Sequence, residues 1–336
     1  MFLFIVRRLL LAIPALFGLV LLTFILIHAV PGDPAAVLAG DQATPQQIQA
    51  LREHYGFDRP ILEQFFRYVS QLASGSLGIS YMTQRQISTE IIERMPATFE
   101  LTLFAMTLAT MIGIPLGVIS AYFHNRWLDH LLRIVSIGGL AVASFWLAIM
   151  LQFTFSMELD LLPVHGRLSQ GLNPPPFVTG MIVLDSLIAG RFDLFRDAFA
   201  HLILPGFALA VAPLATIMRF TRAAVLSTLR REYVFYERAV GYPRLVLMGK
   251  YVLRNSLVTP VTQIGLLLGA ILGSAVVIEA IFDWPGLGSY AVLSIATADY
   301  QATLAVVLVV GCVYALINIL VDLVHAAVDP RILEQL

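Results

Sequence analysis

The chain has 336 residues, of which 58% are hydrophobic and only 13% are charged, and its mean hydropathy is +0.82. Soluble globular proteins carry about 25% charged residues and about 45–50% apolar ones, so this composition excludes a soluble enzyme and a disordered protein. The formal net charge of −1 points to no nucleic-acid partner, and one cysteine, Cys312, cannot form a disulfide framework or a thiolate metal site. The composition predicts an all-α protein that crosses a membrane several times.

Six stretches are long and apolar enough to cross a bilayer, which requires about 20 mostly apolar residues. None of the 21 Lys and Arg residues lies inside any of them. The first follows Arg7-Arg8 and exceeds the apolar core of a signal peptide, so it is interpreted as an uncleaved anchor. The fourth is short and contains Pro205 and Pro213, which predict a bend. The six predicted spans are Leu9–Val30, Ala97–Tyr122, Ile134–Ser156, Leu202–Met218, Leu257–Asp283 and Leu304–Val328.

The basic residues are unevenly distributed between the connections. Segments 1–8, 123–133, 219–256 and 329–336 hold 13 of the 21, although the alternate segments are about twice as long in total. This bias places both termini in the cytoplasm. The long external segment 31–96 is predicted to contain two short amphipathic helices, Thr44–Tyr55 and Arg59–Leu72, before a glycine-rich turn.

Catalytic motifs are missing from the sequence. Lys250 follows Gly249 but precedes Tyr251, so there is no phosphate-binding G-x-x-x-x-G-K-[ST] loop, and neither H-E-x-x-H nor G-x-S-x-G occurs. His124 and His130 share a short cytoplasmic loop, where headgroup contact is favoured over metal ligation. An intramembrane hydrolase is therefore disfavoured. No catalytic, cofactor-binding or metal-binding residue is predicted in this chain.

Ionisable residues near the membrane are few and lie at helix ends. Glu279 and Asp283 are one turn apart at the external end of the fifth span and form a candidate external gate. Asn318, Asp322 and His325 share one face near the cytoplasmic end of the sixth span, where packing is the favoured interpretation. A proton-coupled secondary carrier, the alternative class, would use carboxylates near the midplane, and no span centre holds one.

The fifth span contains Gly265-x-x-x-Gly269-x-x-x-Gly273. Three glycines at this spacing expose a stripe of backbone and allow a neighbouring helix to approach closely. Helix packing is favoured, and a smooth wall for a translocation pathway is the alternative.

The cytoplasmic connection 219–256 carries the strongest functional signal. Its pattern predicts a helix over Val225–Val240, a break at Gly241-Tyr242-Pro243 and a second helix over Arg244–Leu253, because Gly followed by Pro ends helices. Four aromatic residues gather around the break, which favours insertion into a protein cleft over a helix lying among lipid headgroups. These aromatic residues are Tyr233, Phe235, Tyr236 and Tyr242.

Several short motifs, in order along nearly the whole chain, resemble the B-type permease subunit of dipeptide, oligopeptide and nickel ABC importers. These motifs are Arg7-Arg8, Pro31-Gly32-Asp33-Pro34, Gly75-Ser76-Leu77-Gly78-Ile79-Ser80, Arg94-Met95-Pro96-Ala97-Thr98-Phe99-Glu100-Leu101, His201-Leu202-Ile203-Leu204-Pro205, Phe282-Asp283-Trp284-Pro285-Gly286-Leu287-Gly288 and Asp329-Pro330-Arg331. The resemblance implies a type I ABC importer transmembrane domain with an N-terminal extra helix. It divides the chain into residues 1–94, a helix with a periplasmic segment, and a five-helix core over 95–328.

The resemblance also implies partners and a role for the cytoplasmic connection. The chain is expected in the bacterial inner membrane, paired with a homologous permease, two cytoplasmic ATPase subunits that use ATP and Mg²⁺, and a periplasmic substrate-binding protein. The family's EAA loop corresponds to Glu232–Gly241. With Tyr242, the expected coupling residues are Glu232, Tyr233, Phe235, Tyr236, Glu237, Arg238, Ala239, Gly241 and Tyr242.

This sequence departs from the family pattern inside that loop. Glu237 stands where a small residue is usual, Val240 where a basic one is usual, and Tyr242 where an aliphatic one is usual. The resemblance implies peptides as the transported solute, with nickel chelates, glutathione and other small solutes as alternatives. The external loops contain no His-rich or Cys-rich cluster, which disfavours direct metal handling.

Overall fold

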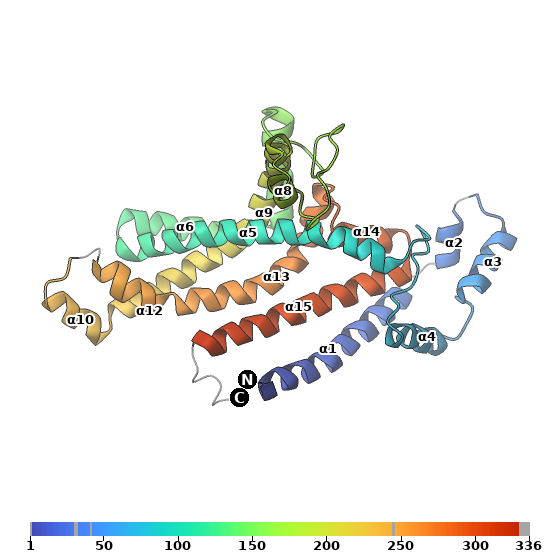
Figure 1. Cartoon of the computed structure of the whole chain (residues 1–336), viewed down its shortest axis with the longest axis horizontal. Helices are drawn as coiled ribbons and strands as arrows, with labels where there is room; N and C mark the ends of the chain where they lie inside the picture. Colours follow the sequence, from blue (N-terminus) through green and yellow to red (C-terminus); the bar gives the residue numbers. More distant parts are fainter. Residues whose placement is uncertain (1, 30–32, 41, 244–245, 329–336) are drawn as a thin grey trace. The chain divides into compact units, whose positions relative to one another are not determined.

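The computed structural model describes residues 2–29, 33–40, 42–243 and 246–328, and over these residues the chain is helical apart from its connecting segments (Figure 1). Two compact units share the chain. The first comprises residues 1–98 and 285–315, and the second comprises residues 99–284 and 316–336. The predicted Pro31-Gly32 and Asp329-Pro330-Arg331 motifs, and Arg244 at the start of a predicted helix, fall outside the described residues.

The first unit begins with the long helix α1 (Phe2–Ala29) and three short helices, α2 (Pro34–Ala39), α3 (Pro45–Tyr55) and α4 (Ile61–Ala73). Local chemistry sets their limits. Thr44 and Gln47 form a capping box at the start of α3, and Gly56, at φ +73°, ends it. The two amphipathic helices predicted in this segment are therefore confirmed to within two residues at each end.

The same unit contains the start of α5 (Ile87–Tyr122), the short helix α14 (Leu287–Ala296) and the first half of α15 (Tyr300–Val328). α1 and α15 lie side by side, because Leu16 and Leu19 of α1 pack on Gly311 of α15 (Figure 1). The core of the unit is apolar and buried. One cluster consists of Ile87, Ile91, Leu287, Tyr290, Ala302, Ala305 and Val306, and a second of Val20, Phe24, Phe65, Tyr68 and Leu304.

The second unit is built around α9 (Phe192–Leu229), against which several other helices pack. α9 buries several alanines and one glycine, Gly206, so its neighbours approach closely. Its neighbours include the rest of α5, α6 (Trp127–Ala141), α7 (Ser144–Leu151), α8 (Ile182–Ile188) and α13 (Val258–Ile281). The remaining elements are η1 (Gln152–Glu158), α10 (Glu232–Ala239), η2 (Leu247–Leu253) and α12 (Arg254–Ser256), of which η1 and η2 are π-helical.

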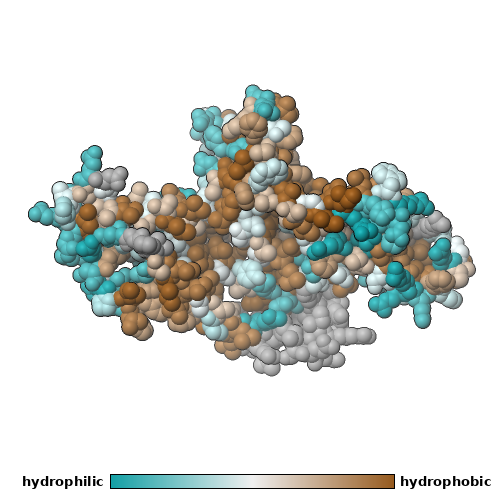
Figure 2. All heavy atoms as spheres, turned by 180° about the vertical axis from the view of Figure 1, so that it is seen from behind, coloured by the Kyte–Doolittle hydropathy of each residue, from teal (hydrophilic) through white to brown (hydrophobic). Residues whose placement is uncertain are grey.

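Within the described residues, five helices are long and apolar enough to cross a membrane, and the number is six if one sharply bent pair counts as a span. The five confirm the predicted first, second, fourth, fifth and sixth spans. Large apolar side chains such as Leu22 and Leu266 are exposed on these helices, as expected for surfaces that face lipid. Around α10, in contrast, hydrophilic side chains gather (Figure 2). The five helical spans are Leu10–Ala29, Ile87–Tyr122, Phe192–Leu229, Val258–Ile281 and Tyr300–Leu323.

The prediction of one continuous third span over Ile134–Ser156 is wrong. The segment is two helices, α6 and α7 with η1, bent by 99° relative to each other. Val142 and Ala143 between them are both extended, with ψ angles of 124° and 128°. Because α6 and α7 each pack against α9, the bend gives both halves a helix to pack on. The length of an apolar stretch predicts that the segment is buried or faces lipid, but it does not predict where the helix bends.

The predicted fourth span is much longer than expected. α9 stays helical through Pro205 and Pro213 and runs for 38 residues, from Phe192 to Leu229. Both prolines are buried, and membrane-spanning helices tolerate proline where neighbouring helices surround it. Charged residues such as Asp193 and Arg222 at its two ends limited the apolar window from which the span was predicted.

Candidate functional site

The connection 219–256, predicted to be cytoplasmic, forms a sharp corner that we call the α10 corner, residues 230–243. α9 ends at Leu229 and α10 begins at Glu232, so the predicted uninterrupted helix over Val225–Val240 is wrong. The backbone N–H groups of Arg230 and Arg231 donate to carbonyls three residues earlier, which tightens and ends α9. The break was missed because neither arginine is a helix-breaking residue.

A glycine ends α10, as the sequence predicts. Gly241 has φ +94°, a conformation that glycine adopts without the steric cost other residues meet. Its N–H donates to the carbonyl of Arg238 over 3.2 Å, and the N–H of Tyr242 donates to the carbonyl of Glu237 over 3.4 Å. Pro243 follows and prevents the helix from continuing.

One buried side chain attaches α10 to the rest of its unit. Val234 is 3% exposed and packs in an apolar cluster with Val225 of α9 and with Leu247 and Val252 of η2. Ala121, at the end of α5, belongs to the same cluster. Any movement of α10 therefore acts directly on α9, α5 and the segment that leads into α13.

The aromatic residues of the corner are exposed to solvent. Phe235 is 71% exposed and Tyr236 is 69% exposed, while Tyr233 and Tyr242 are each 40% exposed. Exposed aromatic side chains on a rigid turn are typical of a surface that a protein partner covers. Of the remaining predicted coupling residues, Glu237 is partly buried and Glu232, Arg238, Ala239 and Gly241 are exposed.

Two tyrosines link the corner to η2. The rings of Tyr242 and Tyr251 lie 5.4 Å apart, and the hydroxyl of Tyr233 donates to the carbonyl of Tyr251 over 3.5 Å. A hydrogen bond with Tyr242 raises the pKa of Tyr251 to about 12, so its phenol is neutral at physiological pH. Beside them is a hollow of about 720 Å³, lined by Thr228, Arg230, Arg231, Glu232, Tyr233 and Asn255.

An ion pair that the sequence analysis missed supports the same region. Asp129 of α6 is fully buried and pairs with Arg222 of α9, whose Nε lies 2.7 Å from Asp129 Oδ1. Ser120 of α5 also donates to this carboxylate, over 2.7 Å. Three helices thus meet at one side chain, two turns before α9 ends. Sequence alone offered only a weak signal, since both residues lie next to apolar spans.

The two residues of the candidate external gate differ in exposure. Glu279 is fully buried, whereas Asp283 is exposed and adopts a left-handed φ of +48° at the end of α13. The N–H of Trp284 donates to the carbonyl of Glu279 over 2.8 Å, which closes the turn. The two carboxylates therefore lie in different environments, and their role at a gate stays a prediction.

A second buried ion pair lies near this turn. Arg167, in the connection between η1 and α8, pairs with Glu100 of α5, and its guanidinium carbon lies 5.6 Å from the Trp284 ring centre. Glu100 also accepts a hydrogen bond from the N–H of Val183 over 2.7 Å. Glu100 and Trp284 belong to two of the recognised sequence motifs, and Arg167 joins them. The sequence analysis did not single out Arg167.

The three glycines of α13 have different surroundings. A Cβ added at Gly265 would clash with Val321 of α15, so this position allows close packing. Gly269 is buried, whereas Gly273 is exposed and has open space around it. A pair that the sequence analysis missed, Gly113 and Gly117 of α5, also makes close contact, with α9. Gly113 and Gly117 are four residues apart, the same spacing that indicated helix packing for the glycines of α13.

Within the described residues, no three His, Cys, Asp or Glu side chains come together as a metal-ligand set. Asp322 lies near the end of α15, and the side chain of His325 falls outside the described part of the chain. That this subunit needs no cofactor of its own stays a prediction from the sequence.

Comparison with known proteins identifies the protein family to which the chain belongs. The model of the family "binding-protein-dependent transport system inner membrane component" matches residues 113–334, and the model of the N-terminal region of such membrane components matches residues 1–102. The chain therefore belongs to the family of binding-protein-dependent transport system inner membrane components. Its membrane domain is that of a type I ABC importer, and it acts as a transport permease in the inner membrane, as the sequence motifs predict.

Individual relatives cover almost the whole chain. It is 43% identical over 315 residues to the probable D,D-dipeptide transport system permease protein DdpB of Escherichia coli K12, which covers 94% of this chain and 93% of the relative. It is 42% identical to the dipeptide transport system permease protein DppB of Alkalihalophilus pseudofirmus, over 97% of this chain and 98% of the relative. It is 34% identical to the glutathione transport system permease protein GsiC of Escherichia coli O6:H1, over 98% of both chains.

Proposed function

We propose that this chain forms half of the pathway through which an ATP-driven importer moves dipeptides or short oligopeptides across the inner membrane. The relatives named as dipeptide permeases share 38–43% identity with it, whereas the glutathione permease shares 34%, which favours peptides over glutathione. A homologous permease completes the pathway. A periplasmic binding protein delivers the peptide, and two cytoplasmic ATPase subunits bind and hydrolyse ATP with Mg²⁺.

The α10 corner is the observation that carries the coupling part of this proposal. Phe235 and Tyr236 are exposed on a short helix that the buried Val234 attaches to the rest of the unit. An ATPase subunit that binds these aromatic residues can therefore move the whole corner. The push reaches α9 and η2 through the Val234 cluster and reaches α6 through Asp129 and Arg222. This chain thus receives mechanical work and performs no chemistry itself.

The membrane topology follows from the basic residues. Both termini and the α10 corner lie in the cytoplasm, and the α2–α4 segment lies outside. A secondary carrier, the alternative class, is less well supported. A secondary carrier would need no exposed corner for docking a partner. The relatives, in addition, are permease proteins of dipeptide transport systems.

Cysteine cross-linking in native membranes tests the docking. In a Cys312→Ala background, Phe235→Cys should cross-link to a co-purifying ATPase subunit, and the complex should hydrolyse ATP. Phe66→Cys on α4 is the matched control, because Phe66 is 67% exposed but lies on the side assigned to the outside. Equal cross-linking from both positions, or from Phe66 alone, would contradict the proposed docking surface and the topology together.

A further inference from the structure

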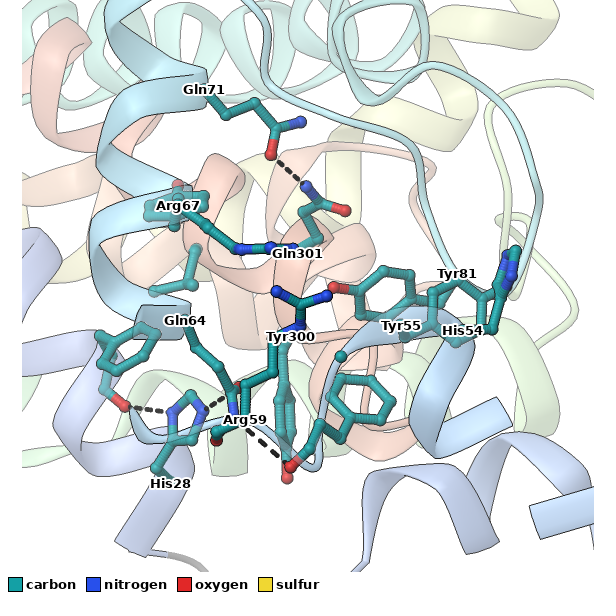
Figure 3. A pocket seen from close by; sticks show the side chains of 15 residues that line it. His28, His54, Tyr55, Arg59, Gln64, Arg67, Gln71, Tyr81, Tyr300 and Gln301 are labelled. Atoms are coloured by element: carbon teal, nitrogen blue, oxygen red, sulfur yellow. Dashed lines mark hydrogen bonds between the residues drawn. The ribbon is translucent and has the colours of Figure 1, made fainter. Parts of the chain in front are cut away.

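A cavity of about 400 Å³ lies inside the first unit, a size within the ~300–1,000 Å³ range of small-molecule sites (Figure 3). Its walls come from four parts of the sequence. These are the end of α1, the segment from the end of α3 through α4, Tyr81, and the start of α15. The coupling and pathway residues discussed above do not line it.

The lining carries positive charge. Among its residues are Arg59 and Arg67 but no Asp or Glu. Both arginines contact one carboxylate behind the lining, Glu63, at 2.6 Å and 3.3 Å. The hydrogen bond from Arg59 lowers the pKa of Glu63, so this carboxyl is ionised at neutral pH. Among the charged groups in contact with these two arginines, one negative charge faces two positive charges, and Asp299 acts on Tyr81 from outside the lining. The surplus beside Arg59 and Arg67 favours an anion.

Aromatic rings and amides complete the walls. Tyr55 and Tyr81 have ring centres 4.5 Å apart, and Phe57 lies 5.6 Å from Tyr81. On the opposite side, the Gln301 amide donates to the Gln71 amide oxygen over 2.8 Å (Figure 3). Rings and amides in these positions can hold an apolar side chain and a peptide group next to the arginines.

One buried hydroxyl in the lining lacks a protein partner. Tyr68 is only 7% exposed, and its hydroxyl oxygen is buried with no hydrogen-bond partner among the described residues. Leaving a buried O–H group without an acceptor costs about 1–3 kcal/mol, so polar groups in such places are normally satisfied. Tyr68 lines the cavity, and an anionic oxygen of a ligand would supply the acceptor.

The direction of α4 favours a water-soluble ligand over a lipid. Gln64 and Gln71 are seven residues apart and share the face that lines the cavity. The exposed apolar Phe66 follows Gln64 by two positions, which places it about 200° around the helix at ~100° per residue. The apolar side of α4 that suits acyl chains is therefore turned away from the arginines.

We propose that this cavity binds the carboxylate end of a short peptide on the external side of the membrane, apart from the translocation pathway. A guanidinium matches a carboxylate in geometry and charge, and Arg59 and Tyr68 would donate to its oxygens. The aromatic rings would hold the terminal side chain. The choice of a peptide, among organic carboxylates, rests on the proposed function of this chain.

The test is saturation-transfer NMR on the full chain in phosphatidylcholine nanodiscs, titrated with the dipeptide Ala-Phe and with its C-terminal amide. The free carboxylate should bind at least about 10-fold more tightly than the amide, because a charged hydrogen bond is lost in the amide. Arg59→Gln should weaken binding by a similar factor. Arg85→Gln is the matched control, because Arg85 forms a comparable exposed ion pair with Glu93 at 2.7 Å but does not line the cavity.

Tyr68→Phe separates binding from folding. The hydroxyl has no protein partner to lose, so the variant should unfold at the same temperature as the native chain and yet bind the dipeptide about 3- to 10-fold more weakly. Equal binding of dipeptide and amide overturns the carboxylate assignment. So does a Tyr68→Phe or Arg59→Gln variant that binds normally, or an Arg85→Gln variant that is equally impaired.

Two further experiments distinguish peptide binding at the cavity from lipid binding and from the proposed permease function. If native mass spectrometry finds phosphatidylglycerol retained through Arg59 and no dipeptide binding, the ligand is a lipid headgroup and the proposal is wrong. If cells import Ala-Phe through this chain but the purified chain does not bind it at the cavity, the cavity proposal fails and the permease function stands. Carboxylate-dependent binding in a chain that imports no peptide would support the site and contradict the proposed function.

Discussion

The guanidinium of Arg222 donates two hydrogen bonds to the Asp129 carboxylate, from Nε over 2.7 Å and from Nη2 over 2.9 Å. Asp129 is fully buried, and its remaining hydrogen bonds come from the Ser120 hydroxyl and the Asn125 backbone N–H. This carboxylate therefore joins α5, α6 and α9 close to the α10 corner. We therefore expect a force applied at the α10 corner to move α5, α6 and α9 together.

Breaking that junction should destabilise the chain. Asp129→Asn removes the charge that balances Arg222, and breaking a buried ion pair costs on the order of 3 kcal/mol. The variant should unfold at a lower temperature in nanodiscs and should import peptide poorly. Asp193→Asn is the control, because its pair with Arg191 is exposed and should contribute little. Equal unfolding temperatures for the native and Asp129→Asn chains would contradict the bracing role.

The contact between α5 and α9 should tolerate no methyl group at Gly117. A Cβ there would lie 2.6 Å from Thr221 Cβ and 2.7 Å from the Met218 carbonyl oxygen, and backbone cannot yield cheaply. Gly117→Ala should cost about 1–3 kcal/mol of stability, as overpacking does. Gly273→Ala, on an open helix surface, should change thermal unfolding very little. A Gly117→Ala chain as stable as the Gly273→Ala chain would show that the helices separate easily.

The left-handed conformation of Gly241 should matter for coupling more than for insertion. Gly241→Val adds a side chain that disfavours φ +94° by about 1–2 kcal/mol, which should reorient the end of α10. ATP-driven peptide uptake should fall severalfold while the amount of chain in the membrane stays the same. Gly249→Ala, in the same connection but with a helical conformation and open space, should transport normally. Normal uptake by Gly241→Val would count against the corner as the coupling element.

Asp185 should make the connection between η1 and α9 sensitive to acid. Burial raises the pKa of its carboxyl, but hydrogen bonds from the Thr179 hydroxyl and from the N–H groups of Val178, Thr179 and Gly180 outweigh burial and lower it. A lowered pKa in the folded state means that the stabilisation is present above the ordinary Asp pKa of about 3.9 and is lost as pH falls below it. The unfolding temperatures of the native and Asp185→Asn chains should differ most at pH 6 and converge towards pH 3. A constant difference across this range would contradict the assignment.

Hydrophobicity and charge predicted most of the fold, because membrane crossing depends on local composition. Five spans and the two short helices α3 and α4 follow from apolar length, amphipathic spacing and the capping residues Thr44 and Gly56. The break at Val142 and Ala143 could not be predicted, since it depends on how both halves pack against α9. Packing between distant segments leaves no periodic signal in either one.

The site residues divide in the same way. Gly241 and the aromatic cluster were found because the end of a helix and exposed aromatic side chains have local signatures. Arg167 and Arg222 were missed because each acquires its role from a carboxylate more than 60 residues away in sequence, Glu100 or Asp129. The local sequence around an arginine beside a span does not show whether its side chain faces lipid headgroups or a buried carboxylate.

The α10 corner separates two tasks between different side chains. Val234 alone is buried and fixes the helix, whereas Tyr242 and Val240, two positions at which this sequence departs from its family, are exposed. Substitutions at such positions can change the partner surface without disturbing the core beneath it. If the α10 corner binds an ATPase subunit as proposed, related permeases could differ in the ATPase that they accept while keeping one architecture. A few surface side chains could then keep the subunits of several such importers in one cell from mixing.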